Sequence, residues 1–204
     1  MRYLIISLTL LLSSCSISVI KGLKKDVLEE THFNNHYFSN LATDYVYKAK
    51  IKIFSDSFGG ILIIKKIKEN NHRILFTTAF GNKIFDFEIV DETFKILYII
   101  DQLNKKPIIS TLKSDFENLI REHNTLYNVY TDQTIYVYQS KLRKGYNYYI
   151  TNETGILLEI IHSKKTKKKT IISFSEIKNN IAKTISIQHN NLPLSIDLLY
   201  LNNQ

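Results

Sequence analysis

The chain has 204 residues, and its composition fits one folded domain. Hydrophobic residues make up 44% and aromatic residues 12%, which is enough apolar material for a sizeable core. Two prolines and six glycines argue against long disordered linkers, and the single cysteine excludes an intramolecular disulfide. A formal charge of +8 favours anionic partners.

The first fifteen residues have the three-part layout of an export signal. Arg2 supplies a positive charge, residues 3–12 form an apolar run, and two serines lead into Cys15. The run is shorter than the roughly 20 residues of a transmembrane helix, so we expect a cleaved signal. Residues 12–15, Leu-Ser-Ser-Cys, resemble the lipobox of bacterial lipoproteins, in which the cysteine thiol receives a diacylglycerol and the signal is cut just before it.

The lipobox resemblance sets the expected topology. It implies residues 1–14 as signal peptide, residues 15–22 as an acylated tether attached through Cys15, and residues 23–204 as one domain. In lipoproteins, Asp after the cysteine favours the inner membrane, so Ser16 points to the outer membrane, with the domain facing the periplasm. Export makes nucleic acid a poor partner and places anionic lipid headgroups nearby.

After a short helix expected at residues 23–31, the sequence is dominated by strand patterns. In residues 45–54, apolar side chains alternate with lysines, which is typical of a half-buried strand. Short connections carrying Asn, Gly or Asp join most of the later runs, which favours antiparallel pairing. The expected strands span residues 45–54, 58–68, 73–80, 83–90 and 94–100, and then 134–142, 146–151, 155–163, 170–177, 183–188 and 194–201.

One long helix interrupts the strands at residues 107–121. Pro107 suits its first turn, and Lys113 and Glu117 are spaced to pair on its polar face. The fold class is therefore mainly β with one long helix, and a sheet of about ten or eleven strands is expected to curl or close. The apolar residues at helical spacing are Ile108, Leu112, Phe116, Leu119 and Ile120.

This order of elements resembles the LolA/LolB lipoprotein-carrier superfamily. Residues 58–65 and 73–88 look like an early strand and the following hairpin of LolB-type proteins, and residues 192–198 look like a late strand. The resemblance implies a half-open antiparallel barrel covered by helix, with the five apolar helix residues as the face of a lid. The lipid anchor favours LolB, itself a lipoprotein, over LolA, a soluble carrier.

The family also implies a function. Its members accept acyl chains in a hydrophobic cavity and pass them on, and many present an apolar protruding loop to the membrane. We therefore expect a monomer that binds membrane lipid and lipoprotein acyl chains and meets a periplasmic LolA-like carrier. The alternative is a non-catalytic structural or interaction lipoprotein of the envelope with a filled barrel.

No motif for catalysis is present. There is no nucleophile elbow, zinc-protease motif or phosphate loop, so we expect neither an enzyme nor a cofactor beyond the lipid on Cys15. His32 and His36 are four residues apart without a third ligand nearby, so we expect two surface histidines and no metal.

A lysine-rich segment joins two of the late strands. Its side chains either contact anionic headgroups or form a solvated turn that protects the strand edges from pairing. The candidate headgroup-contacting residues are Lys164, Lys165, Lys167, Lys168 and Lys169.

Overall fold

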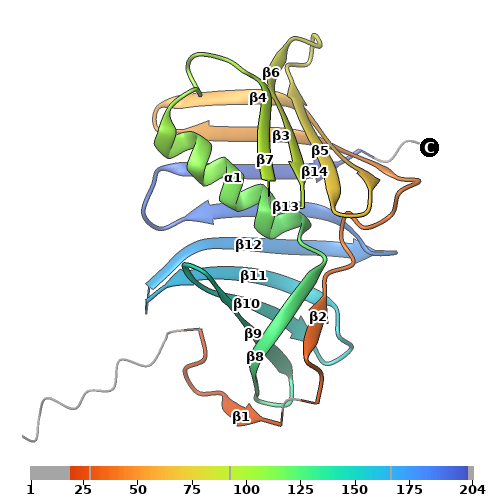
Figure 1. The fold of residues 1–204 in the computed structure, drawn as a ribbon, viewed down its shortest axis with the longest axis vertical. Coiled ribbons are helices and arrows are strands. Elements are labelled where there is room, and N and C mark those ends of the chain that lie inside the picture. The colour runs from red at the N-terminus through yellow and green to blue at the C-terminus, as the bar shows by residue number, and fades with distance from the viewer. Residues whose placement is uncertain (1–18, 28, 92, 166, 202–204) are drawn as a thin grey trace, which may run out of the picture.

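A computed structural model describes residues 19–27, 29–91, 93–165 and 167–201. The predicted signal peptide and Cys15 lie outside these residues. The described part is one antiparallel sheet with one helix across a face of it (Figure 1). The strands are β1 (Lys24–Asp26), β2 (His32–Asn34), β3 (Asp44–Ile53), β4 (Asp56–Lys68), β5 (Asn71–Thr77), β6 (Lys83–Val90), β7 (Thr93–Ile99), β8 (His123–Thr131), β9 (Ile135–Leu142), β10 (Gly145–Asn152), β11 (Leu157–Lys164), β12 (Lys167–Lys178), β13 (Ile181–His189) and β14 (Leu194–Tyr200), and the helix is α1 (Lys106–Ile120).

Two meanders form the sheet. Strands β3 to β7 follow one another in space, as do β8 to β14, and the last strand, β14, pairs with β3 from Leu194↔Ile53 to Tyr200↔Tyr47. Within the described residues the path of paired strands ends at β1 and β7, which are not partners. The sheet is therefore open and not closed into a barrel.

The described residues contain fourteen strands, three more than the eleven ranges expected from the sequence. The additions are β1, β2 and β8. The short helix expected at residues 23–31 is wrong, because β1 forms there and pairs with β8, for example Lys24↔Thr131. A nine-residue helix is marginal in water, and Val27, which it would have had to bury, is 76% exposed.

Strand β8 was not predicted from the sequence because one of its inward-facing residues, Asn124, is polar. Asn124 and Leu126 are buried, while Thr125 and Tyr127 between and beside them are exposed. A buried Asn hides the alternation of apolar and polar residues that identifies a strand. Hydrogen bonds satisfy it here: Asn124 donates to the Arg121 carbonyl and accepts from the Tyr149 hydroxyl.

The helix forms where it was expected, displaced by one residue at each end. Pro107 lies in its first turn, where the missing N–H has no helical partner to lose. The Lys113 ammonium lies 3.6 Å from the Glu117 carboxylate, as the spacing predicted. The ring of Phe116 packs against those of Phe85 and Phe87, with centroids 5.8 and 6.3 Å away.

The space between α1 and the sheet is filled with side chains. Leu112, Phe116 and Leu119 have no exposed surface, and neither do the sheet residues Leu62 and Phe85 of the same core. A side chain without exposed surface touches no space large enough for a water molecule. The interior around these residues therefore has the close packing of a protein core and no empty acyl-chain cavity.

A buried polar pair also fastens α1 to the sheet. The Nε2 atom of His189 lies 2.8 Å from Asp115 Oδ1, and its Nδ1 donates to the Leu194 carbonyl over 2.8 Å. Burial raises the pKa of Asp115. Burial alone would lower the pKa of His189, but the hydrogen bond and charge of Asp115 outweigh it, and the pKa is raised. Both shifts favour keeping a proton between the two side chains.

The first described residues cover the outside of the second meander. Val19, Ile20 and Leu23 pack against a small cluster formed by Val137, Tyr148 and Ile161. Tyr148 faces away from α1, because its neighbour Tyr149 belongs to the main core and successive side chains point to opposite faces. Apolar residues from the segment expected to be a tether thus seal this outer face.

Candidate functional site

The residues proposed from the sequence fall into three separate places. Cys15 lies outside the described residues. The five apolar residues predicted for one face of α1 are all buried in the main core, at most 4% exposed. The lysines lie at one end of the sheet. Lys164 is the last residue of β11, Lys165 begins the turn, and the other three are the first residues of β12. Among the described residues, none of these five lysines forms an ion pair.

An apolar groove lies on the face of the sheet that points away from α1. Lys48 faces outward between Ile61 of β4 and Leu199 of β14, which are its partners in register. The groove between these strands has a volume of about 590 Å³, with Lys48 and Lys50 at its margin. The polar residues Ser57, Thr184 and Asp197 also line it. Its apolar lining residues are Ala49, Gly59, Gly60, Ile61, Ala79, Leu198, Leu199 and Leu201.

Two adjacent glycines of β4 explain the shape of the groove. Gly59 is on the outward side, paired with Lys50, and a Cβ added there would meet no atom within 4 Å. Gly60 is on the inward side, and a Cβ there would collide with the carbonyl oxygen of Thr77. Gly60 therefore allows β5 to approach closely, and Gly59 leaves open space above the strand.

An exposed phenylalanine projects beside the groove. Phe80 is 94% exposed in the turn between β5 and β6, and its neighbour Ala79 lines the groove. Hydrogen bonds from Gly81 N to Thr78 O (3.0 Å) and from Thr78 N to Asn82 O (2.8 Å) close the turn. A single exposed apolar side chain is common on protein surfaces, and Phe80 is of interest because it lies next to the groove. The resemblance to lipoprotein carriers implied such a loop without locating it.

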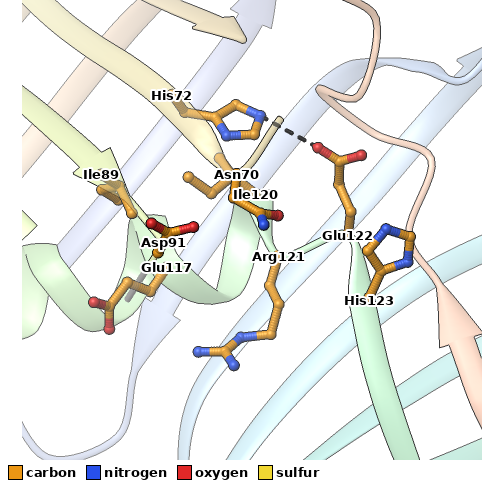
Figure 2. A pocket seen from close by; sticks show the side chains of 9 residues that line it. All are labelled: Asn70, His72, Ile89, Asp91, Glu117, Ile120, Arg121, Glu122 and His123. Carbon is orange, nitrogen blue, oxygen red and sulfur yellow. Dashed lines mark ion pairs between the residues drawn. The ribbon is translucent and has the colours of Figure 1, made fainter. Parts of the chain in front are cut away.

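A second cavity, of about 250 Å³, lies at the C-terminal end of α1 (Figure 2). Its lining is mostly polar and includes Asp91, Glu117, Arg121, Glu122 and His123. Figure 2 shows the Arg121 side chain turned away from Glu122 and His72. The mixed charges and the small volume make this cavity unsuited to an acyl chain.

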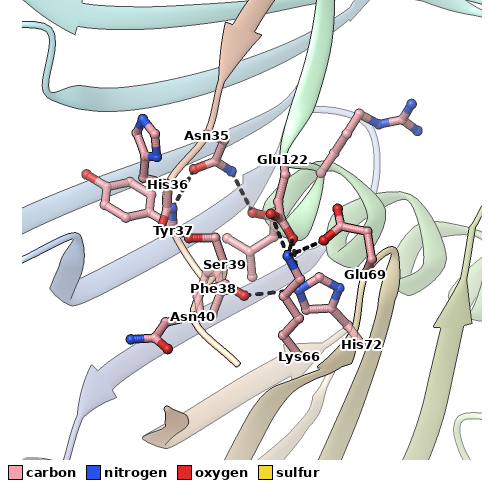
Figure 3. A network of polar contacts seen from close by, with 12 residues as sticks. Asn35, His36, Tyr37, Phe38, Ser39, Asn40, Lys66, Glu69, His72 and Glu122 are labelled. Atoms are coloured by element: carbon pink, nitrogen blue, oxygen red, sulfur yellow. Dashed lines mark hydrogen bonds and ion pairs between the residues drawn. The ribbon is translucent and has the colours of Figure 1, made fainter. Parts of the chain in front are cut away.

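A polar network beside this cavity has a structural role (Figure 3). The Nζ atom of Lys66, 5% exposed, lies 2.8 Å from Glu122 and 3.3 Å from Glu69. Burial would lower the pKa of Lys66, but the two carboxylates outweigh it and raise the pKa. Asn35 donates to the Leu119 carbonyl and accepts from the Tyr37 N–H, which ties the segment after β2 to the end of α1.

The same network contains an arrangement that resembles a metal site. Ligand atoms of Glu69, Glu122 and His123 lie within 4.8 Å of one another. The Lys66 ammonium already contacts both carboxylates and supplies the positive charge that a cation would bring. His72 completes the group: burial lowers its pKa, and its Nε2 lies 3.0 Å from the Phe38 carbonyl oxygen. These contacts explain the cluster without a metal.

Sequence reasoning missed the groove and Phe80. The groove depends on the pairing of β14 with β3, which no short-range pattern reveals. Phe80 was placed at the end of an expected strand, although Gly81-Asn82 directly after it marks a turn. His32 and His36 lie in and after β2, not on a helix. Among the described residues, no helix has the length and apolar content needed to cross a membrane.

Comparison with known proteins gives structural likenesses only. No protein-family model and no curated protein matches the sequence. One similar structure is a "putative outer membrane lipoprotein-sorting protein domain" from Vibrio parahaemolyticus, with a TM-score of 0.46 and 7% identity over 78% of this chain and 84% of that one. Another is a DUF1329 family protein from Desulfovibrio piger, with a TM-score of 0.39 and 8% identity over the same shares.

Both TM-scores are below 0.5, so the function has to be argued from this chain's own residues.

Proposed function

We propose that this chain is a lipid-anchored protein of the bacterial envelope that binds acyl chains without catalysing a reaction on them. The observation that carries the proposal is the apolar groove of β3, β4 and β14 with Phe80 beside it. The expected site was a cavity beneath α1. We place the acyl chain in the outer groove instead, because the side chains beneath α1 leave no room.

The groove suits an acyl chain in size and in part of its chemistry. Ile61, Leu199 and Leu201 give it an aliphatic portion, and each CH₂ moved from water into such a surface contributes about 0.8 kcal/mol. Lys48 and Lys50 line the groove together with one carboxylate, Asp197, and would meet a carboxylate or phosphate at the end of the chain. Because the groove is open along one side, a bound chain keeps part of its surface in water, which favours release to a second acceptor.

The remaining assignments follow from the sequence. Cys15 would carry the lipid and hold the domain at the outer membrane, facing the periplasm. The lysines at positions 164, 165, 167, 168 and 169 would contact anionic headgroups, at about 1 kcal/mol each near a charged surface. Lipoprotein acyl chains and a LolA-like periplasmic carrier would be the partners of a monomeric acceptor.

A second candidate function is an envelope interaction module with a filled interior. The packing beneath α1 favours it, because residues such as Leu112 and Phe116 have no exposed surface. This candidate predicts a bound protein partner and no saturable binding of acyl chains.

Binding of a fluorescent fatty acyl probe to the chain from residue 16 onward separates the two. We expect saturable binding that unlabelled lipid competes away. Gly59→Val adds a side chain in the groove at a position where a Cβ meets no atom within 4 Å, and it should weaken binding at least tenfold. Gly59→Ala should weaken it less. Leu112→Ala, which opens space only beneath α1, is the control and should leave the affinity within twofold.

The opposite pattern would overturn the proposed location. Binding that survives Gly59→Val and strengthens in Leu112→Ala would place the chain beneath α1. The absence of any saturable binding would favour the interaction module.

A further inference from the structure

A third cavity collects positive charge from segments far apart in the sequence. It has a volume of about 570 Å³ and lies where one side of α1 faces the β9–β10 turn and the end of β11. Lys113 and Arg121 come from α1 and its end, Arg143 and Lys144 from the turn, and Lys164 from β11. Glu117 is the only carboxylate among the lining residues.

The fold brings these cations together through one close approach. Gly145 follows the turn with a φ of 118°, and a Cβ there would collide with the carbonyl oxygen of Ser163. The next residue, Tyr146, pairs with Ser163, so the turn lies directly beside the end of β11. Arg143 and Lys144 are thereby held near Lys164, although like charges repel one another.

The protein provides little to balance this charge. Lys113 pairs with Glu117 at 3.6 Å. In the described chain, Arg121, Arg143, Lys144 and Lys164 form no ion pair, and the buried Nε of Arg121 has no hydrogen-bond partner. His162, which also lines the cavity, has its pKa lowered by burial and by Lys164, so it adds no charge at neutral pH.

The donors match an anion with several oxygen atoms. A guanidinium presents parallel N–H groups in the geometry of phosphate oxygens, and two arginines here are unpaired. The lining also includes the hydroxyl groups of Ser110 and Ser114 on α1.

We propose that this cavity binds a phosphate group. Its chemistry fits the headgroup of an anionic phospholipid and equally a free phosphate compound. The proposal does not depend on the acyl groove, which lies on the face of the sheet away from α1, and it differs from general attraction by the lysine turn because it needs Arg121 and Arg143.

Calorimetric titration of the full chain, purified with its anchor in a neutral detergent, tests the site. One arm uses inorganic phosphate, and the other uses the short-chain lipid dihexanoyl phosphatidylglycerol. We expect saturable binding in at least one arm at low salt. The double variant Arg121→Gln/Arg143→Gln should weaken this binding at least tenfold. The control double variant Lys165→Gln/Lys167→Gln removes the same amount of charge outside the cavity and should change the affinity less than twofold.

A second double variant separates loss of binding from loss of folding. Arg143→Gln/Lys144→Gln alters two exposed positions and should weaken binding at least fivefold with an unchanged melting temperature. Equal losses in the cavity and control variants, or no saturable binding in either arm, would overturn the proposal. Binding in the lipid arm alone identifies a headgroup, and binding in the phosphate arm identifies a free phosphate compound. Acyl-probe binding, which should be unchanged in every variant, shows separately whether the groove functions.

Discussion

The two faces of the central strands differ sharply in packing, although the same strands form both. On the side facing α1, Ile51, Leu62 and Ile196 have no exposed surface and form a filled core. On the other side, Ile61 and Leu199 border an open groove. Alternate positions of one strand thus face a packed core and an open groove, and substitutions can test each side without disturbing the other.

The largest effect is expected on the filled side. Phe116→Ala removes a ring that packs against Phe85 and Phe87 and should lower the free energy of unfolding by about 3–5 kcal/mol. Urea unfolding measures it, with the exposed Tyr127→Ala as a control expected to stay within about 0.5 kcal/mol. A loss below about 1 kcal/mol would show that the interior is loosely packed and that the contrast is smaller than described.

The buried pair under α1 is expected to come next. His189→Gln leaves Asp115 buried without its proton-sharing partner and should cost about 3 kcal/mol at neutral pH. Because the folded pKa of His189 is raised, its contribution is fully present below about pH 6.5 and is lost as the pH rises through the folded value. The stability of the wild type should fall across that range, and His189→Gln should flatten the fall. An identical pH profile in both proteins would contradict this.

The adjacent glycines of β4 provide the most direct comparison. Gly60→Ala places a Cβ against the Thr77 carbonyl on the inward side and should cost about 2 kcal/mol. Gly59→Ala, one residue earlier and facing outward, meets no atom within 4 Å and should change stability by less than about 0.5 kcal/mol. Thermal unfolding of the two variants measures the difference. Equal costs would mean that the two sides of β4 do not differ as the structure shows.

The smallest effect on stability is expected at Phe80. Because this side chain is 94% exposed, Phe80→Ser should leave the melting temperature unchanged. If the ring enters a lipid surface, vesicle sedimentation should show binding weakened about tenfold, from the loss of about 1.5 kcal/mol of apolar burial. Tyr127→Ser, exposed on another strand, is the matched control. Equal binding by Phe80→Ser and wild type would remove Phe80 from the membrane contact.

Local patterns predicted much of the fold. The spacing of Ile108, Leu112 and Phe116 located the helix to within one residue, because an amphipathic face and a proline start are both local signals. Turns such as Asn179-Asn180, with φ of 50° and 58°, were visible because Asn tolerates positive φ.

The candidate sites could not be predicted from the sequence, because each is formed by segments that are distant in the chain and adjacent in the fold. The groove requires the last strand to pair with the first long one, and the cationic cavity joins α1, a turn and β11. Strand β8 was hidden by Asn124, whose burial depends on a hydrogen bond from Tyr149, far away in the sequence. Such contacts are decided by tertiary packing and leave no periodic signal in the chain.

The packing of Val19 and Ile20 on the outer face of β9 to β11 has a consequence for reach. An extended chain spans at most about 3.6 Å per residue, so the four steps from Cys15 to Val19 cover no more than about 14 Å. A lipid on Cys15 would therefore keep that outer face of the domain close to the bilayer and would restrict rotation of the domain. Lys144 lies in the turn between β9 and β10, and Lys164 ends β11, so a lipid on Cys15 would also keep these cations near the membrane surface.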